Sequence, residues 1–317
     1  MYENLIYSLN ATVPVFLVII IGYLLRRINL LNEPFCTVAN RFNFTVTLPA
    51  LLFYDIATAN IREGFLLSYV LYCAGATTVS FFLIWGFARL FLKDRSMVGA
   101  FVQASFRGSA AVLGIAFIQN IYGSAGMAPL MIVSCVPLFN IYSVIVLTFE
   151  GETAKPKRDF SVLRLAVLNI CKNPIILAIL AGMLVSLSGI TLPQIALKTV
   201  KNFANLATPL ALIVIGATFE GTKALAKLKP ALVATWIKLV LQPALFLPIG
   251  IALGFNNKLL IAALVMLAAP TTPSCYIMAK NMNNDAVLTT SIVVLTTLLS
   301  SVTLTVWIYL LKMTGCL

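Results

Sequence analysis

The feature that most constrains the fold is a near-continuous succession of long apolar runs. Leu259 to Leu267 reads LLIAALVML, and 286–311 reads AVLTTSIVVLTTLLSSVTLTVWIYLL. Of all residues, 61% are hydrophobic and only 10% are charged, whereas a soluble domain carries about 25% charged residues. Such a chain cannot present an ordinary water-facing surface. These runs predict an all-α polytopic membrane protein.

The length of the chain sets the number of spans. A membrane-spanning helix uses roughly 20 apolar residues, so 317 residues accommodate about ten spans. Little chain then remains for a soluble domain, which argues against an extramembrane enzyme. Hydropathy and helix breakers place the spans near residues 5–25, 35–59, 66–92, 97–120, 125–148, 162–188, 195–219, 230–254, 258–281 and 286–311.

Lys and Arg residues orient these spans, because they prefer cytoplasmic loops. Every odd-numbered span is followed by basic residues: Arg26 and Arg27, then Arg89, Lys93 and Arg95, then Lys155, Lys157, Arg158 and Arg164, then Lys223, Lys227 and Lys229, and finally Lys280. The connections after even-numbered spans are poorer in positive charge. We therefore expect a multi-pass protein of the cytoplasmic membrane with both termini outside. This topology and anionic lipid explain the net charge of +12 without nucleic acid as a partner.

Cysteine and histidine usage bears on metal and cofactor chemistry. The six cysteines fall mostly within apolar runs and share no CxxC spacing, so we interpret them as packing residues. The chain contains no histidine, which removes most zinc sites and the histidine-dependent nucleophile arrangements. We expect no metal, no cofactor and no enzymatic activity.

The two halves of the chain resemble each other. At an offset of 160 residues, VPVFLVIIIGYLL (13–25) aligns with NPIILAILAGMLV (173–185), pairing Pro14 with Pro174 and Gly22 with Gly182. At the same offset Pro49, Leu52 and Ala57 meet Pro209, Leu212 and Ala217. The aligned prolines and glycines carry the argument, because apolar residues match easily by chance. We interpret the halves as an internal repeat.

Each half would hold five spans, and an odd number inverts the second half relative to the first. Inverted repeats with discontinuous helices that meet at the midplane are typical of secondary transporters. We therefore divide the chain into a first five-helix repeat (1–149), a polar cytoplasmic linker (150–161) and a second, inverted five-helix repeat (162–317).

The predicted ninth span is interrupted by two prolines. Pro270 and Pro273 each remove an intrahelical hydrogen bond, and lipid offers no water to the freed carbonyls. Thr271, Thr272 and Ser274 beside them can cap those groups or face a solute. A packed proline kink is the alternative, but two prolines among three hydroxyls favour an unwound crossing.

The fourth span is the expected partner of this break. It places Arg107, Gly108, Ser109 and Gly114 near mid-depth. These polar and helix-weakening residues lie where an inverted repeat requires a second break. We predict that the broken fourth and ninth helices cross and form the substrate site.

At these residues the chain resembles the auxin efflux carrier family, which includes plant PIN-type auxin carriers and bacterial malate, malonate and other organic-anion permeases. The likeness extends over nearly the whole length. The motifs that carry it are LPALLF (48–53), FRGSAAVLGIAF (106–117), PLFN (137–140), PLALIVIGA (209–217), KLVLQP (238–243) and AAPTTPSCYIMAK (268–280).

The resemblance implies ten helices in two inverted five-helix repeats. It also implies a scaffold of spans one, two, six and seven, and a moving domain in which helices four and nine cross beside the substrate.

The sequence departs from the family's motifs at two positions. The family's Asn-Thr pair is here Ser109-Ala110, which puts the family's carboxylate contact in doubt. Its Gly-x-Pro is here Gly114-Ile115-Ala116, which favours a kink over an unwound segment in the first crossover.

The leading interpretation is secondary transport of a small organic anion, a carboxylate, by alternating access. The alternatives are a sodium-coupled symporter of the bile-acid type and a receptor derived from a carrier. The expected partners are the anion and the lipid bilayer, with a homodimer left open.

Four polar residues within spans are further candidates. Arg107 lies about ten residues into its span, roughly 15 Å deep, where it either receives a carboxylate or pairs internally with Asp55 or with carbonyls freed near Pro270. Asp55 is either a proton site or a structural partner, and we favour the structural role. Lys238 is interpreted as snorkelling to the cytoplasmic face, with substrate contact or ion coupling as the alternative. Asn140 either links helices or lines the site.

Overall fold

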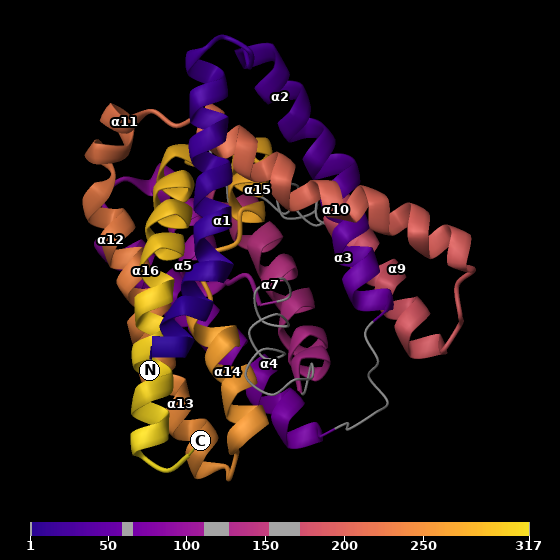
Figure 1. The fold of residues 1–317 in the computed structure, drawn as a ribbon, viewed down its shortest axis with the longest axis vertical. Coiled ribbons are helices and arrows are strands. Elements are labelled where there is room, and N and C mark those ends of the chain that lie inside the picture. The colour runs from indigo at the N-terminus through magenta and orange to yellow at the C-terminus, as the bar shows by residue number, and fades with distance from the viewer. Residues whose placement is uncertain (1, 59–65, 111–126, 152–171, 317) are drawn as a thin grey trace, which may run out of the picture.

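The computed structural model describes residues 2–58, 66–110, 127–151 and 172–316, with side chains described from residue 13 onward. Within these residues every element is helical (Figure 1). The first half contains α1 (Tyr2–Arg27), α2 (Glu33–Phe42), η1 (Asn43–Thr47), α3 (Leu48–Ala57), α4 (Leu67–Phe91), η2 (Arg95–Met97), α5 (Val98–Phe106) and α7 (Ala128–Glu150). The second half contains α9 (Pro174–Ser188), α10 (Gln194–Ala217), α11 (Gly221–Ala226), α12 (Leu228–Trp236), η3 (Ile237–Leu241), α13 (Gln242–Ala252), α14 (Asn257–Ala268), α15 (Ser274–Asn281) and α16 (Ala286–Met313).

Five helical stretches in the described residues are long and apolar enough to cross a membrane. They are α4, α7, α10, the continuous run of α12, η3 and α13, and α16. The shorter helices α9 and α14 are also apolar. The predicted spans over 66–92, 125–148, 195–219 and 286–311 coincide with α4, α7, α10 and α16 to within a few residues.

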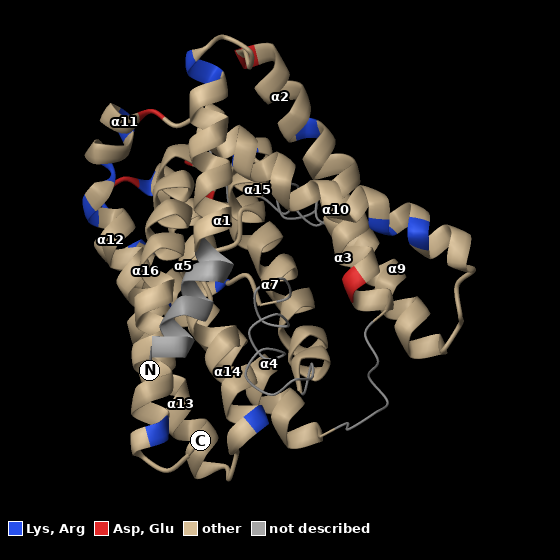
Figure 2. Cartoon of the chain, viewed as in Figure 1, with Lys and Arg blue, Asp and Glu red and all other residues tan. Residues whose placement is uncertain are grey.

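Charge is distributed as a membrane protein requires. Figure 2 shows most basic and acidic segments at the ends of helices, whereas the middle of the bundle is almost entirely uncharged. Both chain ends lie in the lower half of Figure 1, and the α1–α2 connection lies at the opposite end. Many large apolar side chains on α1, α4, α9 and α16 face outward, where lipid would cover them.

Two helix pairs pack closely through glycine. Helix α1 packs on α10, where a Cβ atom on Gly22 would collide with the Ile213 carbonyl and one on Gly216 with the Ile19 carbonyl. Helix α9 packs on α3, where a Cβ atom on Gly182 would lie 3.1 Å from the Phe53 carbonyl oxygen. Small residues allow such backbone approach in membrane helices. These four helices form one group of the bundle, which we call the glycine-packed group.

Helices α4, α5, α7 and α11 to α16 form a second group around α5 and α14, whereas α2 and η1 pack on α10. Phe81 of α4 stacks on Tyr142 of α7 with ring centroids 4.6 Å apart. At the end of α7, Glu150 accepts hydrogen bonds of 2.6 Å from Trp85 Nε1 and from Arg89 Nε, both on α4. Helix α16 packs along α5, α12, α14 and α15, and also along α1 of the glycine-packed group. Figure 1 shows α14 and α15 one above the other, with a break between them at mid-height of the bundle.

Candidate functional site

Two chain segments that leave a helix meet at the centre of the second group, at a point that we call the crossing. Helix α5 ends at Phe106, and Arg107 is extended (φ −98°, ψ 145°). Helix α14 ends at Ala268, and α15 begins at Ser274, so the predicted interruption at the two prolines is present. The amide of Ser109 donates a 2.8 Å hydrogen bond to the Pro270 carbonyl, which ties the two segments together.

The chain leaves the helix at Arg107 without a proline, and the kink expected from Gly114-Ile115-Ala116 lies outside the described residues. Gly108 explains how the segments approach. A Cβ atom there would lie 2.8 Å from the Ala269 carbonyl oxygen and 3.0 Å from Lys238 Nζ. The absence of a side chain at Gly108 therefore makes room for the second segment and for the lysine.

Side chains from the break after α14 and from α13 satisfy the last carbonyls of α5. Thr271 Oγ1 donates to the Ala104 carbonyl at 2.7 Å, and Gln242 Nε2 donates to the Ser105 carbonyl at 2.6 Å. The amide of Thr271 itself donates to Thr296 Oγ1 at 3.1 Å. Because the carbonyls at a helix end have no partner within the helix, these bonds allow α5 to end inside the protein. Thr271 thus has a capping role.

Lys238 does not snorkel, and this prediction from depth is wrong. Its side chain is fully buried and lies in the π-helical turn η3. Its Nζ contacts the carbonyl oxygens of Phe106 at 3.5 Å and Met266 at 3.4 Å. The ammonium group therefore lies between the carboxyl ends of α5 and α14.

Arg107 is 4% exposed and has only neutral partners among the described residues. Its Nη2 donates to Ser274 Oγ at 2.9 Å. Its Nη1 contacts Ser143 Oγ at 3.3 Å and the Met278 sulfur at 3.1 Å. Its Nε–H has no hydrogen-bond partner. No described carboxylate lies within 4.0 Å of this guanidinium, so Asp55 is not its partner. Its hydrogen bonds go to side chains and not to the carbonyls near Pro270.

A small cavity of about 40 Å³ lies against Arg107. Thr272 and Ser274 line it and contact each other through their hydroxyls at 3.1 Å. The opposite wall belongs to the glycine-packed group. The cavity is lined by Arg107, Gly108, Ser109, Ala110, Val136, Phe139, Thr272, Ser274 and Ile277 on one side and by Leu48, Leu51, Leu52, Asp55, Ala207, Thr208 and Ala211 on the other.

Asp55 is half-buried in this cavity wall. No hydrogen bond or ion pair joins it to another residue of the described chain. It therefore shares the cavity with Arg107 without neutralising it. The structure does not place Asp55 as an internal structural partner of the arginine.

The other candidates fall in different places. Asn140 is fully buried on α7, where its Nδ2 donates to the Val136 carbonyl at 2.8 Å and its Oδ1 has no partner. It does not line the cavity. Pro270 and Pro273 shape the break behind Thr272 and Ser274. Gly114 lies outside the described residues, as does nearly all of the 150–161 linker.

Sequence reasoning missed Gln242, Thr296 and Ser143. Gln242 stands four residues after Lys238 within the KLVLQP motif, and that spacing was an available signal because i and i+4 share a helix face. No comparable signal marks Thr296, since α16 contains many buried Ser and Thr residues. Within the described residues, no group of three or more Cys, Asp or Glu side chains is placed to hold a metal ion.

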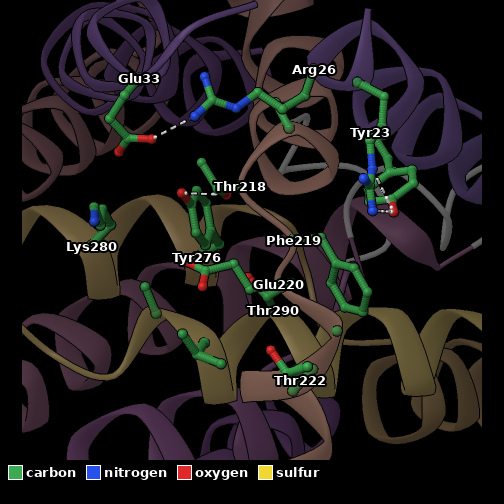
Figure 3. Close-up of a pocket in the computed structure, with 16 residues that line it drawn as sticks. Tyr23, Arg26, Glu33, Thr218, Phe219, Glu220, Thr222, Tyr276, Lys280 and Thr290 are labelled. Atoms are coloured by element: carbon green, nitrogen blue, oxygen red, sulfur yellow. Dashed lines mark hydrogen bonds and ion pairs between the residues drawn. The ribbon is translucent and has the colours of Figure 1, made fainter.

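A second, larger cavity of about 580 Å³ opens at the end of the bundle that carries the α1–α2 connection. Figure 3 shows Arg26 and Glu33 beside each other at its edge, joined by a 3.6 Å ion pair, and Lys280 nearby. Tyr276 Oη and Thr218 Oγ1 are 3.0 Å apart. This contact joins α15 to the carboxyl end of α10. The larger cavity thus lies further along the same two helices that line the small one.

A comparison with protein families decides the class of protein. The model of a family described as "Membrane transport protein" matches residues 7–308. The chain belongs to this family. The match confirms the resemblance to the auxin efflux carriers that the motifs indicated.

Full-length relatives are similar to this transporter. A protein of Rhizobium meliloti (strain 1021) named "Putative malonate transporter" is 26% identical over 312 residues, which cover 94% of each chain. The "Uncharacterized transporter YfdV" of Escherichia coli (strain K12) is 25% identical over 98% of this chain and 99% of its own. An "Uncharacterized transporter" of Methanothermobacter thermautotrophicus is 22% identical over 95% of this chain and 97% of its own.

Proposed function

We propose that this protein is a secondary transporter that moves a small organic anion, a carboxylate, across the cytoplasmic membrane by alternating access. The observation that carries the proposal is the buried, unneutralised guanidinium of Arg107 at a cavity between two helix groups. An Arg at this depth costs roughly 2.5–3.5 kcal/mol on insertion scales. A carboxylate bound by two N–H groups of the guanidinium would offset this cost.

Helix dipoles strengthen this preference for an anion. Arg107 Nη2 reaches Ser274, the first residue of α15. The amino end of a helix carries roughly half a positive charge, and half-helix amino ends face anionic substrate groups in transporters of the inverted-repeat type. The guanidinium and the α15 amino end therefore add their positive potentials at one wall of the cavity. The Thr272 and Ser274 hydroxyls beside them supply further hydrogen bonds.

The size of the cavity implies movement. A volume of about 40 Å³ compares with the ≈ 30 Å³ that one water occupies in the liquid, so no organic carboxylate fits without opening. The walls belong to different helix groups, since α3 and α10 face the crossing segments. We propose that the crossing segments move against the glycine-packed group. The Tyr276–Thr218 contact would break when the site opens toward the larger cavity.

We further propose that the ten spans form two inverted five-helix repeats. The helix pairing supports this arrangement. In the alignment of the two halves, α1 corresponds to α9, and α3 corresponds to α10. The contact of α1 with α10 thereby becomes the contact of α9 with α3. The aligned residues Gly22 and Gly182 both provide close contacts in these pairs. With the positive-inside rule, the larger cavity faces the cytoplasm and both termini lie outside.

The test of the proposed function is anion binding by purified protein with changes at Arg107. Malonate is the first probe because of the relative's name, followed by malate, acetate and indole-3-acetate. The measurement is the rise in unfolding temperature with anion concentration, with radiolabelled uptake into proteoliposomes for the anion that binds. Arg107→Gln removes both the charge and the bidentate donor geometry of the guanidinium. We expect the affinity for the anion to fall on the order of 100-fold, as for a lost charged hydrogen-bonded pair.

Two variants give this test its controls. Arg107→Lys keeps the charge without the bidentate geometry, so its affinity should lie between those of the wild type and Arg107→Gln. Arg95→Gln removes an exposed arginine and should leave binding unchanged. Unchanged affinity in a folded Arg107→Gln protein would show that Arg107 is structural and that dipoles and hydroxyls hold the anion.

A further inference from the structure

The second buried cation of the crossing has different surroundings from the first. Lys238 Nζ lies 3.5 Å from the carbonyl of Phe106, the last residue of α5, and 3.4 Å from the carbonyl of Met266, near the end of α14. The side chain is fully buried, and no described carboxylate lies within 4.0 Å of it. Its partners are therefore the negative carboxyl ends of α5 and α14.

The charge of the Lys238 ammonium group balances the partial charges of the two helix ends. The carboxyl end of a helix carries roughly half a negative charge, so the ends of α5 and α14 together present about one. A single ammonium group neutralises that charge. In transporters built from broken helices, half-helix carboxyl ends and unwound carbonyls are the groups that coordinate a coupling Na⁺. Lys238 thus occupies, from within the protein, the position that such an ion would take.

We propose that the Lys238 ammonium is a built-in cation that replaces a coupling sodium ion at the crossing, so that anion transport by this chain proceeds without sodium. The inference about transport rests on the proposed function, whereas the inference about the site does not. It separates the two cations: Lys238 neutralises helix ends, and Arg107 is left for the substrate. It also argues against the sodium-coupled alternative.

The surroundings explain why Lys238 holds this position. The π-helical turn Ile237–Leu241 adds a residue to the helix and changes the direction of the side chains after it. The Leu239 carbonyl accepts a 3.0 Å hydrogen bond from Trp307 Nε1 of α16. Gln242, one turn further, donates to the Ser105 carbonyl. The ammonium group and the amide therefore approach consecutive carbonyls of α5 from one helix.

The first experiment measures site occupancy without transport. Lys238→Ala in the purified full-length protein should unfold at a lower temperature than the wild type. Because the truncation leaves a space lined by carbonyls, Na⁺ or methylammonium should raise that temperature by a few degrees more than choline at equal ionic strength. Leu239→Ala removes a neighbouring buried side chain from the same turn and should show no difference between the cations.

The second experiment uses the wild type alone, so it holds even if Lys238→Ala does not fold. Na⁺ should raise its unfolding temperature no more than choline does, and replacing Na⁺ with choline should leave malonate uptake unchanged. The inference is overturned if Na⁺ specifically stabilises the wild type, if a Na⁺ gradient drives accumulation, or if Na⁺ and methylammonium fail to stabilise folded Lys238→Ala. Absence of uptake of any tested anion would instead contradict the proposed function, and the thermal measurements would still decide the site.

Discussion

Buried and water-facing cations of this protein have opposite kinds of partners. At the end of the bundle, Lys227 pairs with Asp285 at 3.0 Å and Asp94 at 3.5 Å. At the crossing, Arg107 and Lys238 contact only hydroxyls, a sulfur and carbonyls among the described residues. Charge is thus neutralised by carboxylates where water already screens it. Inside the protein the cations have no carboxylate partner, although the low dielectric there makes electrostatic interactions strongest.

This difference in partners indicates that the surface cations and the buried cations have different roles. Lys227 and Asp285 are partly buried, with side chains 27% and 12% exposed, and their ion pair ties the end of α11 to the start of α16. Two cations without carboxylates inside a membrane protein require another source of negative potential. Helix ends supply it for Lys238, and we propose that the substrate supplies it for Arg107.

The largest effect is expected from Gly108→Ala, which tests whether the crossing depends on close backbone contact. The added Cβ atom would lie 2.8 Å from the Ala269 carbonyl oxygen and 3.0 Å from Lys238. Such overpacking costs roughly 1–3 kcal/mol, measured as a lower unfolding temperature. Gly86→Ala is the matched control, because nothing lies within 4 Å of its Cβ position. Equal effects of the two changes would mean that the crossing tolerates displacement.

The crossing also shows how far the sequence could predict this site. Pro270 and Pro273 predicted the break because proline removes hydrogen bonds locally. The partners of the broken ends could not be found in this way. Thr271 reaches Ala104, 167 residues away, and Gln242 reaches Ser105, 137 residues away. Only the folded chain brings these groups together.

Lys238 illustrates a second limit. Depth along a span gives the distance to the membrane surface, but not the direction in which the side chain points. The π-helical turn η3 alters that direction, and neither Gly nor Pro marks it in IKLVL. Helix identity was easier to predict, since long apolar runs such as those of α4, α7 and α16 permit few structures in lipid.

An intermediate effect is expected from Asp55→Asn, which tests whether an unpaired acid at the cavity opposes the anion. Asp55 lines the same cavity as Arg107 without pairing with it. Removing its negative charge should tighten anion binding by on the order of tenfold, since unit charges several ångströms apart interact by more than 1 kcal/mol at partly buried sites. The measurements are malonate affinity and the pH dependence of uptake. Loss of the pH dependence with unchanged affinity would instead identify Asp55 as a proton-coupling site.

The smallest effect is expected from Asp94→Asn at the water-facing cluster. The hydrogen bond from the Ser96 hydroxyl, supported by the Ser96 amide and by Lys227, holds the pKa of Asp94 below its ordinary value. A carboxyl whose pKa is lower in the folded state stabilises the fold above its unfolded pKa, near 3.9, and loses this contribution as the pH falls through the folded value.

At pH 7 the substitution should therefore lower the unfolding free energy by less than about 1 kcal/mol, because Asp94 is half exposed. The difference from the wild type should shrink below about pH 4 and in concentrated salt. Glu220→Gln is the control, since among the described ion pairs Glu220 pairs only with Lys223, three residues along in α11. If Asp94→Asn destabilised the protein as much as Gly108→Ala, the water-facing cluster would be as important to the fold as the crossing, and the contrast between the two regions would fail.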